Sequence, residues 1–74
     1  MARPNGPGDS LKIQKAIANS PLTDAEIASR TRLSVQSINA YRHGHRKPSA
    51  GNLGRLARAL NVDVRELLRE EVNN

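Results

Sequence analysis

The stretch LTDAEIASRTRLSVQSINAYRHGHRKPS, residues 22–49, has the most informative structural signals in this chain. It opens with TDAE at residues 23–26, a capping box in which the threonine and glutamate side chains bond backbone amides that a first helical turn leaves unpaired. Ile27 and Ala28 follow and can face a core. The pattern predicts a short helix that begins directly after the threonine.

A second short helix is predicted over residues 35–43. Ser34 can act as its N-cap, Ile38 and Tyr41 occupy its buried side, and Gly44 ends it. About three residues separate it from the preceding helix. Two short helices with a tight connection, each with one apolar stripe, are typical of a helix-turn-helix, in which the second helix keeps a free outer face.

Three further helical segments flank this pair. The first covers residues 10–19 with Asp9 or Ser10 as N-cap, and the next follows Ser49, with apolar side chains at helical spacing through residue 60. The last begins with DVRE at residues 63–66, which has the pattern of another capping box. No segment has the alternation of a strand, so the sequence predicts an all-α domain of five helices.

The chain has 74 residues and no cysteine, which allows one small domain without disulfides. Residues 1–9 are rich in proline and glycine and are expected to form a flexible arm, and residues 10–72 are expected to form the domain. No apolar run approaches the roughly 18 residues needed to cross a bilayer. We therefore expect a cytoplasmic protein without membrane contact.

Positive charge is concentrated in the middle of the chain. Lysine and arginine outnumber aspartate and glutamate by 12 to 7. Between Ile27 and Val62 lie seven cations and no carboxylate: Arg30, Arg32, Arg42, Arg46, Lys47, Arg55 and Arg58. Residues 63–71 instead carry four acids against two arginines. The basic middle favours a polyanionic partner, and a solvated basic surface is the alternative.

The outer face of the second helix in the pair has the side chains that read base edges. Its residues are Val35, Gln36, Ser37, Asn39 and Ala40, without the glutamate and lysine of an ordinary solvated helix. Glutamine and asparagine can bond adenine through two hydrogen bonds, and small apolar side chains can contact the thymine methyl group. These five residues are the predicted base contacts in duplex DNA.

Other chemistries find less support. His43 and His45 lack a third metal ligand, so we expect no metal and no other cofactor. The serines have no base with an orienting carboxylate nearby, so we expect no catalytic residues and no enzyme. Tyr41 is the single aromatic residue and is expected in the core, which leaves no platform for single-stranded bases. No small-molecule ligand is expected.

The sequence resembles the Cro- and phage-repressor-type family of helix-turn-helix proteins, also called Xre-type. The resemblance rests on LTDAEIA at 22–28, LSVQSI at 33–38, GHRKPS at 44–49, and Leu53, Leu56, Ala57, Leu60, Asn61, Val62 and Leu67. It implies a five-helix lambda-repressor-like domain whose recognition helix runs from Val35 to Tyr41, with Gln36, Asn39 and Ala40 facing bases. The full set expected on phosphates is Thr23, Arg42, His45, Arg46 and Lys47.

The sequence departs from the family pattern in three ways. Arg32 stands in the turn where the family usually has glycine, and Asp24 stands where it favours a glutamine that bonds phosphate. Ile17 and Arg42 occupy the places of an arginine and a glutamate that often pair. We expect Asp24 to stabilise the N-terminus of its own helix and Arg42 to be free to reach phosphate.

The function that these features predict is a sequence-specific transcriptional regulator, most simply a Cro-like or immunity-type repressor of phage or chromosomal origin. A homodimer is expected, because two half-sites multiply a weak discrimination. Leu68 and Val72 of the last helix are the predicted dimer contacts, since adjacent leucines on a helix cannot both face the core. The alternative is an antitoxin-type module that binds a protein partner and autoregulates its operon.

Overall fold

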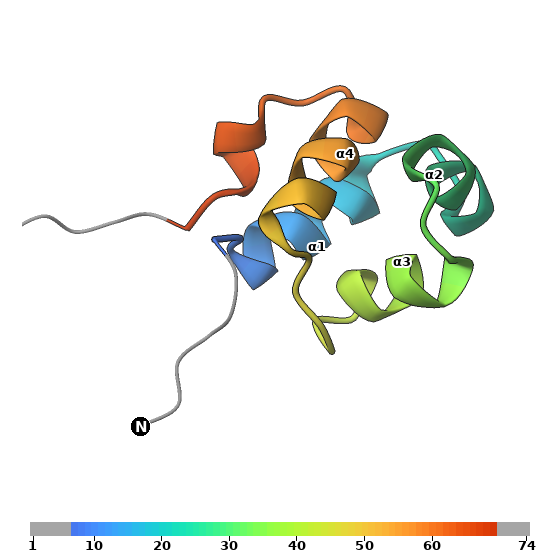
Figure 1. Ribbon diagram of the computed structural model, residues 1–74, viewed down its shortest axis with the longest axis horizontal. Coiled ribbons are helices and arrows are strands. Elements are labelled where there is room, and N and C mark those ends of the chain that lie inside the picture. The colour runs from blue at the N-terminus through green and yellow to red at the C-terminus, as the bar shows by residue number, and fades with distance from the viewer. Residues whose placement is uncertain (1–6, 70–74) are drawn as a thin grey trace, which may run out of the picture.

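The computed structural model describes residues 7–69, which form four α-helices and one 3-10 turn (Figure 1). In chain order the elements are α1 (Ser10–Asn19), α2 (Asp24–Thr31), α3 (Val35–Arg42), α4 (Ala50–Leu60) and the 3-10 turn η1 (Val64–Leu67). The all-α prediction is confirmed over these residues. None of the described helices is long and apolar enough to span a bilayer.

Each α-helix begins at a side-chain cap that the sequence predicted. The Asp9 carboxylate accepts from the Lys12 N–H at 3.0 Å. Ser34 and Ser49 cap α3 and α4 by accepting backbone N–H bonds three residues on. The capping box of α2 is complete, because Thr23 and Glu26 exchange two bonds, of 3.1 and 2.8 Å. Capping satisfies amides that would otherwise lack a partner, so these short helices have defined starting points.

One core joins all five elements. Its buried members are Ile13, Ile17, Ile27, Ala28, Ile38, Tyr41, Leu53, Leu56, Ala57 and Leu67. Ile17, where the family often has arginine, is fully buried. In Figure 1, α1 lies behind α4, while α2 and α3 lie together on one side of them. The core thus holds α3 from within and leaves its other face to solvent.

The prediction of a fifth α-helix was wrong, since the segment after α4 is the short 3-10 turn η1. The Asp63 carboxylate accepts from the N–H of Arg65, two residues on, and the predicted box with Glu66 is not formed. Leu68 then takes an extended conformation, with ψ 149°. A cap bonded two residues ahead supports a tight turn, and the extended residue after it ends the helix.

The start of the domain lies earlier than the predicted boundary at residue 10. The N–H of Asp9 donates to the carbonyl of Leu67 at 2.9 Å, and that of Arg69 donates to the carbonyl of Pro7 at 2.8 Å. Between them, Gly8 is buried and pairs with Leu68 as an isolated antiparallel bridge. Residues 7–9 therefore belong to the folded domain, and the rest of the predicted arm lies outside the described residues.

Candidate nucleic-acid interface

The connection between α2 and α3 consists of three residues, Arg32, Leu33 and Ser34. Buried Thr31 organises it: its hydroxyl donates to the Ile27 carbonyl at 2.8 Å and accepts from the Leu33 N–H at 3.2 Å. Arg32 turns the chain in the left-handed conformation, with φ 64° and ψ 27°. This arrangement is a helix-turn-helix, with α2 and α3 packed on a shared core.

The outer face of α3 carries the predicted base-reading residues. Val35 is 49% exposed, and Gln36 and Asn39 are also exposed. Ser37 and Ala40 are half-buried, and the Ser37 hydroxyl already lies 3.0 Å from the hydroxyl of the N-cap Ser34. Gln36 and Asn39 are therefore the side chains with free hydrogen-bonding groups on the most accessible part of this helix.

A basic loop follows directly after α3. His45, Arg46 and Lys47, together with Gly44 and Ser10, line a hollow of about 420 Å³. The rings of His43 and His45 stack with centroids 5.8 Å apart. Gly44 has φ 75°, and a Cβ there would come within 2.6 Å of the Gln14 side-chain nitrogen, so the loop needs glycine at this point.

A comparison with known protein families matches residues 13–67 to the family described as Helix-turn-helix. The chain belongs to the Xre- and Cro-type helix-turn-helix family. It is a DNA-binding transcription regulator of this type, and the family is not typically enzymatic. No curated protein matches the chain.

Arg42 forms an ion pair with Asp24, which the sequence did not predict. Its Nε and Nη2 donate to the same carboxylate oxygen of Asp24, at 2.9 and 2.7 Å. The pair joins the end of α3 to the start of α2, with the two side chains 31% and 22% exposed. The sequence predicted a free Arg42. The structure instead pairs it with Asp24, the acid that stands where the family favours glutamine. The pair also neutralises a carboxylate that DNA would repel.

The structure also describes a further predicted phosphate contact, Thr23, and one of the two predicted dimer contacts, Leu68. Thr23 is exposed, but its hydroxyl oxygen accepts the capping bond from Glu26 N–H, which leaves its hydrogen available to a phosphate. Leu68 is half-buried and packs against the domain's own core. Its predicted exposure required an α-helix through Leu68, and this helix is not formed. Val72 lies outside the described residues.

The fold brings together four arginines from two separate parts of the chain. Arg30 and Arg32 at the end of α2, and Arg55 and Arg58 on α4, line one hollow between these helices. The sequence could have predicted that Arg55 and Arg58 lie together, because they stand three residues apart and share a helix face. Arg30 and Arg32 join them only because α2 packs against α4.

Proposed function

We propose that the protein recognises a specific operator in duplex DNA with α3 and represses transcription by occupying a promoter. The observation that carries this proposal is the exposed, acid-free face of α3 presented by a compact helix-turn-helix. In this arrangement α3 enters the major groove, and Gln36 and Asn39 form hydrogen bonds to adenine edges. Val35 and Ala40 supply apolar contact to thymine methyl groups.

Phosphate contacts hold α3 in register on the duplex. Arg46 and Lys47 follow α3 and supply positive charge beside it, and the ring of His45 adds an N–H donor. Thr23 adds a hydroxyl at the start of α2, where the partial positive charge of the helix terminus also favours a phosphate. Such contacts fix the orientation of α3 without reading sequence themselves. A cytoplasmic protein, able to reach the chromosome or phage DNA, is part of this proposal.

We further propose a homodimer, with half-sites about 34 Å apart on the duplex. The predicted contact is retained at the C-terminal segment with Leu68 and Val72. Val64 in η1, a large hydrophobic residue that is 37% exposed, offers a position at which this contact can be tested. Val64→Glu adds a charge at an exposed site, so it should leave the fold intact and give monomers by analytical ultracentrifugation. A dimer that survives both this change and Leu68→Glu would place the interface elsewhere.

The antitoxin-type alternative requires an apolar surface for a protein partner. Within residues 7–69 the exposed large hydrophobic side chains are Leu11, Val35 and Val64, which belong to three different elements. Single exposed hydrophobic residues are ordinary on a protein surface, so these three do not by themselves indicate a protein partner. Repression through DNA therefore has the better support.

The test begins with selection of binding sites from random duplex DNA. Gln36→Ala and Asn39→Ala should each weaken binding to the selected site by about 1–3 kcal/mol and leave random duplex almost unchanged. Arg46→Ala should weaken both duplexes and lower the salt slope by about one unit. Asn19→Ala, an exposed amide on α1, is the matched control. Equal losses on both duplexes for Gln36→Ala and Asn39→Ala would contradict base reading.

A further inference from the structure

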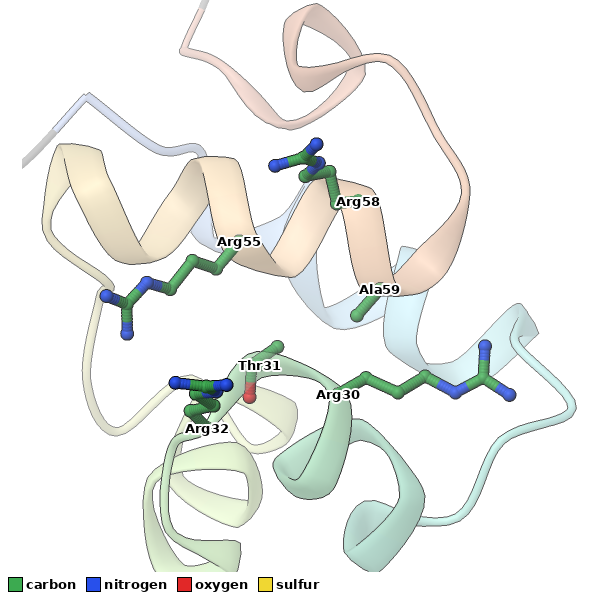
Figure 2. Close-up of a pocket in the computed structure, with 6 residues that line it drawn as sticks. All are labelled: Arg30, Thr31, Arg32, Arg55, Arg58 and Ala59. Carbon is green, nitrogen blue, oxygen red and sulfur yellow. The ribbon is translucent and has the colours of Figure 1, made fainter.

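A hollow of about 380 Å³ lies between the end of α2 and α4 (Figure 2). Its inner residues are Thr31 and Ala59, both buried. The other four lining residues are Arg30, Arg32, Arg55 and Arg58, and all four are exposed. We call these four residues the arginine surface. They are distinct from every residue assigned above to base or phosphate contact.

The arginine surface has no internal counter-charge. Among residues 7–69 the two ion pairs are Arg42 with Asp24 and Arg65 with Asp63. No hydrogen bond from the four guanidinium groups to another described residue is formed. Four like charges around one hollow repel one another, and a bound anion would relieve that repulsion.

The backbone at Arg32 supports the same conclusion independently. This residue adopts φ 64° at the end of α2, a conformation that glycine takes without steric cost. A strained non-glycine residue persists where its surroundings or its role require it. The side chain of Arg32 is exposed and lines the hollow, so packing does not require it. What the side chain contributes at this point is positive charge.

The directions of the side chains distinguish between possible ligands. In Figure 2 the side chains of Arg32 and Arg55 end on one side of the hollow, Arg30 extends the opposite way, and Arg58 turns away over α4. Diverging guanidinium groups suit an extended anion better than a single compact one. A protein interface needs an apolar or aromatic anchor, and the lining offers only Ala59.

We propose that the arginine surface binds the sugar-phosphate backbone of duplex DNA that flanks the stretch read by α3. A duplex strand presents one phosphate per about 3.4 Å of helix axis, which gives diverging arginines separate partners. Arginine bonds phosphate through two parallel N–H groups, so each side chain can hold one phosphate. This proposal rests on the DNA binding proposed above, but it does not depend on base reading by α3.

The test compares Arg55→Gln/Arg58→Gln with Lys15→Gln/Arg69→Gln, which removes the same charge from exposed side chains outside the hollow. Anisotropy titrations at several salt concentrations use two duplexes, the selected site alone and the same site with about one helical turn of flank on each side. On the longer duplex, Arg55→Gln/Arg58→Gln should lower the salt slope by about two units and the affinity about tenfold. On the shorter duplex it should match the control variant.

Arg32→Gly provides a second variant, which relieves the backbone and therefore should not fail by unfolding. It should lower the salt slope on the longer duplex by about one unit. Equal losses on both duplexes, or equal losses in the control variant, would overturn the proposal. Stronger competition by polyglutamate than by random duplex would also overturn it, in favour of an acidic protein.

Two further experiments are needed. One distinguishes flanking DNA from a second duplex as the source of the phosphates, and the other separates the arginine surface from base reading by α3. The first experiment tests whether the protein captures two differently labelled duplexes at once. If it does, and if Arg55→Gln/Arg58→Gln loses this joint capture, the phosphates belong to a second duplex. That result would overturn the proposal that the arginine surface binds DNA flanking the site read by α3. Random duplex long enough to include flanks separates the arginine surface from base reading. If site selection fails but the arginine variants still weaken binding to this duplex, the arginine surface stands and the operator proposal fails.

Discussion

The ends of α2 and α4 have the same turn and different continuations. Arg32 and Asn61 both adopt the left-handed conformation, with φ 64° and 59°. The backbone N–H of each donates to the carbonyl four residues back, and the next N–H donates to that same carbonyl. After Arg32 the chain enters an α-helix, whereas after Asn61 it enters a single 3-10 turn. Identical turn geometry therefore does not determine the element that follows it.

The difference lies in the cap after each turn. Ser34 accepts from the N–H of Ser37, three residues on, which suits the first turn of an α-helix. Asp63 accepts from the N–H of Arg65, two residues on, and the chain soon leaves the helical region to pair with Gly8. The first continuation presents a free helix face, and the second closes the core. Changes on each side can test this division.

The largest effect is expected from Leu67→Ala in η1. Leu67 is fully buried although its element is only one turn long, so its loss leaves a cavity in the shared core. We expect a loss of about 2–5 kcal/mol, measured by urea unfolding. Leu68→Ala, at a half-buried neighbour, should lose clearly less. Equal losses at the two sites would mean that η1 does not have a single anchoring residue.

A smaller effect is expected from Thr31→Val, which tests the first turn. Valine keeps the volume but removes the hydroxyl that accepts from the Leu33 N–H. The Leu33 N–H keeps a bond to the Ala28 carbonyl at 3.2 Å, so losing the hydroxyl bond should cost about 0.5–1.5 kcal/mol in unfolding free energy. Thr31→Ser keeps the hydroxyl and serves as the control. If Thr31→Val and Thr31→Ser lose the same amount, packing of the methyl group holds the turn.

Glycine substitutions at the two left-handed positions test how much strain each turn contains. Arg32→Gly should raise the unfolding free energy by about 1 kcal/mol, because arginine is strained at φ 64°. Asn61→Gly should change it by only about 0.5 kcal/mol or less, since asparagine tolerates this conformation. Thermal unfolding of both variants is the measurement. A destabilised Arg32→Gly would show that the arginine side chain supports the fold.

The smallest effect is expected from the ion pair between Asp24 and Arg42. Both groups are partly exposed, so Asp24→Asn should cost about 0.2–1 kcal/mol, and less at high salt. A double-mutant cycle with Arg42→Gln isolates the coupling between the two side chains. A coupling energy near zero would leave Arg42 available to phosphate, as the sequence alone predicted.

Local signals in the sequence determined the helices and the helix-turn-helix. The caps at Asp9, Thr23, Ser34 and Ser49 act within three residues of the cap, so a short window contains the whole interaction. The apolar residues repeat at helical spacing, which identified the buried sides of α3 and α4. For the same reason the free face of α3 could be predicted without coordinates.

Features that join distant parts of the chain depend on tertiary packing, which no local stretch of sequence contains. The Arg42 pair spans 18 residues, and the bridge that ends the last turn joins Gly8 to Leu68. The arginine surface likewise requires α2 to pack on α4. Local pattern predicted an α-helix after Asp63, but pairing with the N-terminal segment extends the chain there instead. Propensity is a weak preference, and contacts between distant residues override it wherever an element is short.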